Sequence, residues 1–456
     1  MFVGREKELK QIRELLKRDC CFIIVYGVRR VGKSTLISEA LKSSSDKTVI
    51  IEAKSENLRS NLNRFIGACH KAGIFPKAVR PESFEDAFDY INSLEGSYNI
   101  VIDEYPRLKY NTNPSTENVD EIFQEIIDQH SKNIRLIISG SHVTMMKELI
   151  QHSNPLFGRH DLKVELKPLT YKECVAFYPN YTPYERVTMY SVFGGSPFTN
   201  SQIDPSLTPL ENIINKAVSP NSPIASYPHE ILLDIISKKN VEWILSLIGN
   251  GKTSYTDIET KLGKKDNGGL APQLKRLEQM GIISKVKPIN ATIKEKKTRY
   301  EISDNFLRFY YTYLYEGNTE DLSDEEQYFK DNIASSFVTF VSHRFEQICR
   351  TYFRIQKSKG LLEGVTGVGY WYYDDPANKK NGEFDIALKR EDGMDLYEAK
   401  FYKGPVSKKM INDESMQVDS IPGVRICNRG FISLNGFEPD CEGIPNLITG
   451  EDLYRD

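Results

Sequence analysis

The stretch Gly27-Val28-Arg29-Arg30-Val31-Gly32-Lys33-Ser34-Thr35 matches the phosphate-binding pattern G-x-x-x-x-G-K-[ST]. The apolar run at residues 21–26 directly precedes it and has the length and composition of a strand buried on both faces. Apolar residues recur at helical spacing after it, at Leu36, Ala40 and Leu41. The pattern therefore predicts a loop that joins a buried strand to the N-terminus of a helix.

Each residue type in this loop has a physical role in binding ATP with Mg²⁺. Backbone N–H groups of a glycine-containing loop surround phosphate oxygens, and the helix dipole favours their negative charge. Lys33 is expected to reach the β and γ phosphates, and Ser34 to ligate Mg²⁺. The predicted nucleotide-binding residues of the loop are Gly27, Val28, Arg29, Arg30, Val31, Gly32, Lys33, Ser34 and Thr35.

A pair of carboxylates follows a second apolar run. Ile100-Val101-Ile102 leads into Asp103 and Glu104, and the ends of parallel strands face the nucleotide in such sheets. Asp103 is placed to hold Mg²⁺ through water, and Glu104 to orient or deprotonate the water that attacks the phosphate. Strand-like runs at residues 47–52 and 134–138 alternate with helical stretches, which predicts an α/β fold with a doubly wound parallel sheet.

Further motifs flank these two sites and together resemble one family. They are Phe2-Val3-Gly4-Arg5-Glu6-Lys7-Glu8-Leu9, the phosphate-binding loop, Ile102-Asp103-Glu104, Ser139-Gly140-Ser141 and Pro155-Leu156-Phe157-Gly158-Arg159. In order and spacing they resemble the archaeal-type ATPase family, within the AAA+/STAND branch of the P-loop NTPases, over residues 1 to about 200.

This resemblance adds residues to the predicted site. The implied adenine-pocket residues are Val3, Gly4 and Arg5, and the implied γ-phosphate sensor is Ser139 or Ser141. Arg159 is a candidate arginine finger that would stabilise charge on the transferring phosphoryl group, in its own subunit or in a neighbour; the alternative is an ordinary surface arginine. The predicted catalytic residues are therefore Lys33, Asp103, Glu104 and Arg159.

Two departures from the family pattern favour slow, switch-like hydrolysis over motor-like turnover. The sensor position holds Ser where AAA+ motors often have Asn or Thr, and no clear second-sensor arginine stands near Gly194-Gly195-Ser196-Pro197. The Gly-Gly-x-Pro turn is itself typical of the resembled family. It suits a lid that closes through a bend with unusual backbone angles.

From residue 241 the pattern changes to three short helices followed by two strand-like runs. The helices are marked by apolar positions: Val241, Ile244, Leu245 and Ile248, then Tyr255, Ile258 and Leu262, then Leu270, Leu274 and Leu277. The strand-like runs, residues 282–286 and 299–302, are separated by a loop that carries Lys294, Lys296 and Lys297. This order predicts a winged helix.

Two uses of the winged helix remain open. In the first, the third helix enters a DNA major groove while the basic loop contacts phosphates. The side chains expected to face the bases are Gln273, Lys275, Arg276 and Gln279. In the second, the winged helix is an internal lid or a protein dock, and the lysines are simply solvated.

Near the C-terminus, two predicted strands place acids and one lysine on a common face. Residues 383–388 and 396–401 alternate polar and apolar side chains across an Asp392-Gly393 turn, so Asp385 would face Glu398 and Lys400. A half-exposed hairpin would produce the same alternation without any catalytic role.

This constellation is similar to the restriction-endonuclease-like (PD-D/ExK) superfamily. The similarity implies that Asp385 and Glu398 bind a second Mg²⁺, that Lys400 holds or activates water, and that Glu346 is the acid of the preceding helix. Phe384 stands where the family pattern has Pro, as in many divergent members.

The composition is that of a globular chain with reduced thiols. The chain has 456 residues, 39% hydrophobic and 27% charged, a net charge of −3 and 7 scattered Cys. His142, His152 and His160 fall at irregular spacings and are expected to be polar loop residues rather than metal ligands. No leader or membrane-length apolar run is visible, so we expect a cytoplasmic protein without membrane contact.

We expect four domains from these patterns. They are a P-loop ATPase core at residues 1–170, a helical lid at 171–237, a winged helix at 238–315 and a restriction-endonuclease-like domain at 325–456. The set predicts an ATP-binding and ATP-hydrolysing AAA+/STAND-type switch that acts on or near DNA. The alternatives are an ATP-controlled, Mg²⁺-dependent nuclease and a non-cleaving DNA-binding regulator in which ATP is only a switch. The expected cofactors are ATP and Mg²⁺, and the candidate partners are DNA, an unidentified protein and further copies of the chain.

Overall fold

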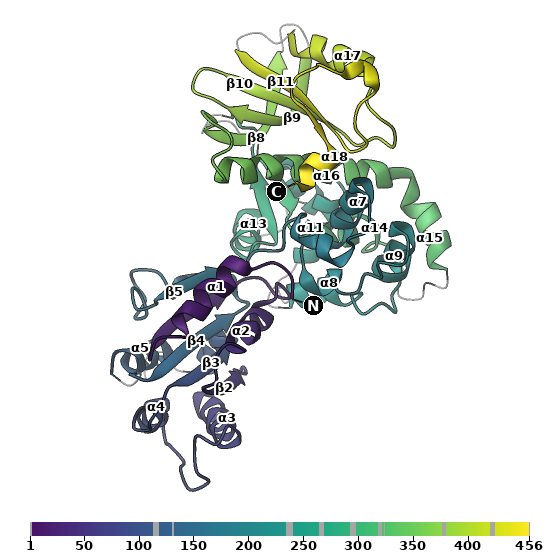
Figure 1. Ribbon diagram of the computed structural model, residues 1–456. Coiled ribbons are helices and arrows are strands. Elements are labelled where there is room, and N and C mark those ends of the chain that lie inside the picture. The colour runs from purple at the N-terminus through teal and green to yellow at the C-terminus, as the bar shows by residue number, and fades with distance from the viewer. Residues whose placement is uncertain are drawn as a thin grey trace. The chain divides into compact units, whose positions relative to one another are not determined.

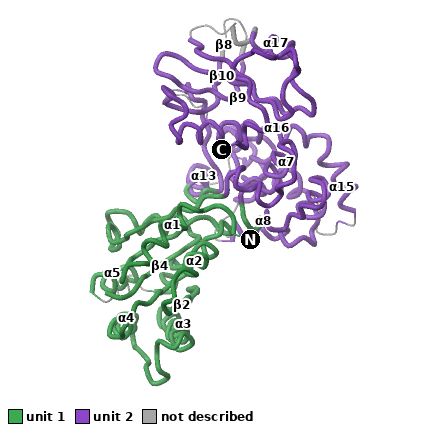
Figure 2. Tube along the Cα trace, in the orientation of Figure 1, with its two compact units in different colours: residues 1–168, 196–198, 279–281 green, residues 169–195, 199–278, 282–456 purple. Residues whose placement is uncertain are grey.

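The chain forms two compact units in the computed structural model (Figures 1 and 2). Unit 1 comprises residues 1–168, 196–198 and 279–281, and unit 2 comprises residues 169–195, 199–278 and 282–456. The structure describes residues 2–112, 118–129, 132–233, 240–263, 269–291, 298–317, 322, 324–375, 380–419 and 425–455. The predicted lid, winged helix and C-terminal domain belong to unit 2 except for residues 196–198 and 279–281, and the boundaries between these domains remain predictions.

Unit 1 is built on a five-stranded sheet in which every paired strand is parallel. The strand order is β2-β3-β4-β1-β5, so β4 lies between β1 and β3. The strands are β1 (Cys21–Tyr26), β2 (Lys47–Glu52), β3 (Tyr98–Asp103), β4 (Ile134–Gly140) and β5 (Leu162–Glu165). Every residue of β1 and β4 is buried, as expected for central parallel strands covered on both faces.

Helices cover both faces of this sheet, which confirms the predicted doubly wound α/β fold. Alternate residues of β1 point to opposite sides: Ile23 and Val25 join the core under α1 and α2, whereas Phe22 and Ile24 join the core under α3, α4 and α5. The helical elements of unit 1 are α1 (Glu6–Leu15), α2 (Lys33–Leu41), α3 (Leu58–Lys71), α4 (Phe84–Asn92), η1 (Tyr105–Lys109), α5 (Val119–Gln129) and α6 (Val143–Glu148).

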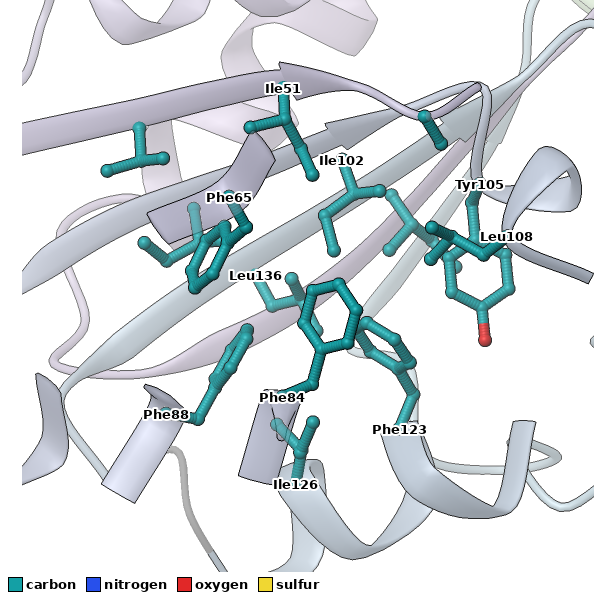
Figure 3. Close-up of a cluster of buried hydrophobic side chains, with 14 of the residues drawn as sticks. Ile51, Phe65, Phe84, Phe88, Ile102, Tyr105, Leu108, Phe123, Ile126 and Leu136 are labelled. Atoms are coloured by element: carbon teal, nitrogen blue, oxygen red, sulfur yellow. The ribbon is translucent and has the colours of Figure 1, made fainter. Parts of the chain in front are cut away.

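The larger core of unit 1 is rich in aromatic rings (Figure 3). Phe65 stacks on Phe88 at 5.6 Å between ring centroids, and Tyr105 meets Phe123 edge-on at 5.2 Å. Such offset and edge-to-face pairs contribute about 0.5–1.5 kcal/mol each beyond the burial of their area. Tyr105 directly follows Glu104, so this core anchors the end of β3 where the predicted catalytic carboxylates stand.

The first part of unit 2 is mainly helical. Its elements are η2 (Glu173–Phe177), α7 (Pro183–Phe193), α9 (Pro209–Asn212), η3 (Ile213–Val218) and α10 (Tyr227–Leu232), whereas α8 (Pro197–Asn200) begins in unit 1 and ends in unit 2. There follow α11 (Val241–Gly249), α12 (Tyr255–Leu262), α13 (Leu270–Gln279), the antiparallel strands β6 (Ile283–Val286) and β7 (Arg299–Ile302), and α14 (Asn305–Tyr313). The three helices and two strands therefore occur where the apolar pattern predicted them.

The C-terminal part of unit 2 is a second five-stranded sheet with the order β12-β11-β10-β9-β8. Strands β8 to β10 pair antiparallel, and β10 to β12 pair parallel. Its elements are α15 (Glu325–Asn332), α16 (Ala334–Ser358), β8 (Gly367–Asp375), β9 (Lys380–Lys389), β10 (Met394–Lys400), α17 (Lys408–Asp419), β11 (Ile426–Ser433), η4 (Pro439–Cys441), β12 (Leu447–Thr449) and α18 (Gly450–Tyr454).

Long-range contacts join the lid helices to the C-terminal sheet within unit 2. The Tyr171 hydroxyl donates to the Leu453 carbonyl oxygen at 2.8 Å, and the rings of Tyr184 and Phe401 stack at 4.5 Å. Helix α16 contacts α7 as well as β8, β9 and β10. These contacts explain why the predicted lid and C-terminal domain form one compact unit. Of the helices that the structure describes, none combines the length and apolar character needed to span a bilayer.

Candidate nucleotide site and C-terminal carboxylate cluster

The loop between β1 and α2 has the backbone that a phosphate site requires. Gly32 caps α2 with a left-handed φ of 95°, which glycine adopts without steric cost. A Cβ atom at Gly27 would collide with the carbonyl oxygen of Leu166, so only glycine fits there. Both glycines of the sequence pattern are therefore needed for this loop conformation.

Lys33 turns back over its own loop. Its Nζ donates to the carbonyl oxygens of Gly27 at 3.0 Å and Val28 at 3.1 Å. The residue is only 6% exposed, and burial lowers its pKa although Glu104 and Asp103 act in the opposite direction. A buried ammonium group that lies inside the loop is well placed to exchange these carbonyl partners for phosphate oxygens.

Asp103, at the end of β3, connects the loop to β4. Its Oδ2 accepts from the Ser34 hydroxyl at 2.7 Å, and its Oδ1 accepts from the Ser139 hydroxyl at 2.6 Å. The strand order explains why these three side chains meet, because β4 lies between β1 and β3 and so places Ser139 at the same end of the sheet as the loop and Asp103. Ser34 and Asp103 present hard oxygen ligands to the same point, which fits the requirements of Mg²⁺.

Glu104 is held in a strained backbone conformation. Its φ is 55°, in the left-handed region that costs a non-glycine residue about 1–2 kcal/mol. Its Oε2 accepts from both the hydroxyl of Ser141, at 2.8 Å, and the backbone N–H of Ser141, at 3.1 Å. The sequence pointed to Ser141 as a nucleotide sensor, but no local pattern indicated that it would hold Glu104.

The predicted adenine-pocket residues belong to unit 1, as the loop does. Val3 and Gly4 are half-buried. Arg5 is buried, has a left-handed backbone φ of 71°, and its side chain donates to the carbonyl oxygen of Lys167. The hydroxyl of Ser196 donates to the Arg30 carbonyl oxygen at 3.2 Å. Ser196 therefore contacts the phosphate-binding loop within unit 1, although more than a hundred residues separate the two in the chain.

Arg159 lies near the amino ends of the sheet strands, whereas the phosphate-binding loop lies at their carboxyl ends. It precedes Asp161, whose N–H donates to the carbonyl oxygen of Phe22 at the start of β1, whereas the loop follows the end of β1. The guanidinium forms a bidentate pair with Asp128, with Nε–Oδ1 and Nη2–Oδ2 distances of 2.9 Å. This position does not fit an arginine finger that acts on the nucleotide bound to the same chain. An arginine finger that acts on a neighbouring subunit remains a prediction.

The C-terminal sheet brings the second set of predicted residues together. Asp385 on β9 accepts from the Ala399 backbone N–H of β10 at 3.0 Å. Lys400 Nζ lies 3.1 Å from Glu398 Oε1 and 2.6 Å from Glu414 Oε1. Glu414, on α17, was not predicted, and no sequence pattern marks it.

Burial and mutual repulsion perturb the carboxylates of this cluster. Burial, followed by the charges of Glu398 and Glu346, raises the pKa of Asp385 well above its ordinary value. Burial also raises the pKa of Glu398 to about 7, against the opposing effect of Lys400. Clustered carboxylates of this kind suit a divalent cation, which would relieve their repulsion. Within the described part of the chain, however, no three His, Cys, Asp or Glu side chains are grouped as a metal site.

Several other sequence predictions can be located. His142 accepts from the Met145 N–H at 3.3 Å and so caps α6, and the His152 ring lies 4.0 Å from that of Phe157. Burial lowers the pKa of His160. On α13, Lys275 and Gln279 are exposed, whereas Gln273 and Arg276 are half-buried. The wing lysines Lys294, Lys296 and Lys297 lie outside the described residues.

The phosphate-binding loop on a five-stranded parallel sheet defines the chain as a P-loop NTPase. A family model described as an ATPase domain predominantly from Archaea matches residues 2–199, and a model of archaeal and bacterial proteins of unknown function matches residues 310–413. The uncharacterized protein MJECL04 of Methanocaldococcus jannaschii is 30% identical over 410 residues, which cover 87% of this chain and 86% of that protein. The chain therefore belongs to the archaeal-type ATPase family, with this second domain at its C-terminus.

Solved structures with a related fold cover a smaller part of the chain. The Walker-type ATPase PABY2304 of Pyrococcus abyssi is 16% identical, with a TM-score of 0.49, over 68% of this chain and 96% of that one. The ORC2 protein of Aeropyrum pernix is 13% identical, with a TM-score of 0.48, over 68% of this chain and 92% of that one.

Proposed function

We propose that the protein hydrolyses ATP with Mg²⁺ and uses the nucleotide as a switch for the elements of unit 2. The hydrogen-bonded connection from Ser34 through Asp103 to Ser139 carries this proposal, because it joins the loop, the acidic strand end and the sensor strand at one point. Ser34 and Asp103 would hold Mg²⁺, which neutralises phosphate charge when bound. Lys33 would bind the β and γ phosphates, and Glu104 would orient or deprotonate the attacking water.

Substitution at Asp103 tests this proposal. We expect Asp103→Asn to lower Mg²⁺-dependent phosphate release about 100-fold or more, since charge at a phosphoryl-transfer centre contributes several kcal/mol. Asp161→Asn is the matched control, because Asp161 belongs to the same unit but contacts the start of β1. Undiminished phosphate release by Asp103→Asn would contradict the proposal.

We further propose that the switch acts on DNA through the segment from α11 to β7. The order of three helices and an antiparallel hairpin supports a winged helix, and exposed Lys275 and Gln279 on α13 are available to a DNA groove. We expect Lys275→Glu to weaken duplex binding and reduce its salt dependence, measured by fluorescence anisotropy at several salt concentrations. Duplex affinity that is the same in wild type and Lys275→Glu would favour a lid or protein dock.

The C-terminal carboxylate cluster supports a second candidate, a Mg²⁺-dependent nuclease. Asp385 on β9 accepts from the backbone N–H of Ala399, which follows Glu398 on β10, and Lys400 lies beside Glu398, as the superfamily pattern requires. We expect Asp385→Ala to abolish cleavage of DNA in Mg²⁺ or Mn²⁺, and Asp413→Ala, an exposed acid of α17, to leave it unchanged. Absence of cleavage in the wild type, with DNA binding insensitive to Asp385→Ala, would instead indicate a non-cleaving regulator.

A further inference from the structure

Unit 2 contains a cavity that the proposed ATPase does not use. Its volume is about 810 Å³, within the range typical of small-molecule sites. Residues of α11, β7, α14, α16, β8 and β9 line it, so it opens between the predicted winged helix and the C-terminal sheet. Four arginines are among the lining residues: Arg299, Arg308, Arg344 and Arg350. We call this space the arginine cavity.

Acidic side chains balance only two of these arginines directly. Arg299 pairs with Glu383 at 2.9 Å. Arg350 lies 3.8 Å from Glu346 and donates to the backbone carbonyl oxygen of Asp385 at 2.7 Å.

Arg308 and Arg344 form the less compensated half of the cavity. Arg344 is only 5% exposed, and its Nη2 donates to the carbonyl oxygen of Ile302 at 3.3 Å. Burial, with the neighbouring charge of Arg308, lowers the pKa of Arg344 to about 9, and burial also lowers the pKa of Arg308. The charge of Glu301, which also lines the cavity, acts on the pKa of both arginines in the opposite direction and offsets part of their positive charge.

Three buried donor atoms on the cavity residues have no hydrogen-bond partner among the described residues. They are Arg344 Nε, Arg308 Nη1 and Tyr370 Oη. Tyr370 is 4% exposed, so water in bulk does not satisfy its hydroxyl. An unsatisfied buried donor is costly, and more so when it belongs to a charged group. An anionic acceptor with several oxygens is the kind of ligand that would offer partners to such donors.

We propose that the arginine cavity binds a phosphate group, presented by a free nucleotide or by a nucleic-acid strand. The planar guanidinium fork matches the oxygens of a phosphate, and a tyrosine hydroxyl adds a neutral donor. Arg308 and Arg344 would carry the charge recognition, and Tyr370 would fix the orientation. The cavity shares Glu346 and Asp385 with the candidate nuclease cluster but is separate from the phosphate-binding loop. The proposal does not depend on ATP hydrolysis or on DNA cleavage.

Calorimetric titration of full-length chains tests the proposal. All variants carry Lys33→Ala, so that the nucleotide loop contributes little binding. The three probes are inorganic phosphate, AMP and a 5′-phosphorylated single-stranded oligothymidylate. We expect at least one probe to bind the Lys33→Ala chain, and Arg344→Gln to weaken that binding about tenfold or more, since a hydrogen bond to a charged group contributes about 1.5–3 kcal/mol. Tighter binding of AMP would identify a free nucleotide, and tighter binding of the oligonucleotide a nucleic-acid strand.

Two additional variants keep the test independent of folding defects. Arg308→Gln changes a half-buried arginine on a different helix and should weaken binding to a similar extent. Lys357→Gln changes an exposed cation on α16, the helix of Arg344, and should leave the affinity unchanged. Thermal melts of each variant verify folding. Failure of all three probes to bind the Lys33→Ala chain, or equal affinity in the Arg308→Gln chain, would overturn the proposal.

Discussion

Replacing Lys33 by Met separates the contribution of the lysine to ATP binding from its contribution to the stability of the fold. The Lys33 ammonium is buried, and among the described residues its hydrogen-bond partners are only backbone carbonyl oxygens of its own loop. Burial holds the folded-state pKa below its ordinary value of 10.5. The unfolded chain therefore binds this proton more tightly than the folded chain. Stability should rise with pH between the lowered folded-state pKa and 10.5, and the buried charged amine lowers the stability at neutral pH.

The expected magnitudes follow from this comparison. Lys33→Met removes the buried charge and keeps most of the side-chain volume, so the free energy of unfolding without nucleotide should stay within about 1 kcal/mol of wild type or rise. With ATP at about 100 times its Kd, wild type should gain about 2.7 kcal/mol. For a unit of about 150–250 residues, that gain corresponds to a rise of about 5–11 °C in Tm.

Scanning fluorimetry with and without ATP and Mg²⁺ measures both quantities in one experiment. We expect wild type to show the nucleotide-dependent rise in Tm, and Lys33→Met to show the same starting Tm with no rise. The reasoning would be refuted if Lys33→Met kept the ATP-dependent rise. A loss of several kcal/mol without nucleotide would also refute it, because Lys33 would then stabilise the fold.

Three further predictions concern other parts of the molecule. Tyr105→Phe removes the buried hydroxyl that donates to Asp120 at 2.9 Å; urea unfolding should show a loss of about 1–2 kcal/mol, and an unchanged midpoint would contradict this. Because the folded-state pKa of Glu398 is raised from 4.5 to about 7, the folded chain binds this proton more tightly, so stability should fall as pH rises through that window. Glu398→Gln should make the urea midpoint of unit 2 less dependent on pH, and an identical pH profile would argue against the raised pKa. Arg159→Ala should lower ATP turnover without changing ATP affinity if Arg159 acts on a neighbouring subunit, and turnover per chain should then rise with protein concentration; unchanged turnover would leave Arg159 as a surface residue.

The features that the sequence predicted well depend on local patterns. The strand, loop and helix around Gly27 and Lys33 follow from a contiguous apolar run and the positions of glycine. The strands that carry Asp385 and Glu398 were predicted from alternation along a single hairpin, which fixes the facing side chains through the register. Periodicity of this kind is visible within about ten residues, so tertiary contacts are not needed to detect it.

The features that the sequence did not reveal depend on contacts between distant segments. The bond from Ser141 to Glu104 requires the strand order, which places β4 beside β3. The ion pair between Arg159 and Asp128 likewise forms only because the folded unit brings α5 close to the segment that precedes β5. Arg308 and Arg344 approach each other only because α14 and α16 line one cavity. No spacing rule along the chain encodes these relationships.

The most direct test of the ATPase assignment is the steady-state ATP turnover of Glu104→Gln beside its control, Glu52→Gln. The two acids lie at the same end of neighbouring strands, since Glu52 pairs in register with Asp103, the residue before Glu104, but Glu52 forms an ion pair with Arg107 at 2.9 Å. We predict that Glu104→Gln lowers kcat by about 10²–10⁴-fold and leaves ATP affinity within a few-fold of wild type, whereas Glu52→Gln preserves both. Full turnover by Glu104→Gln would contradict the proposed role of this carboxylate.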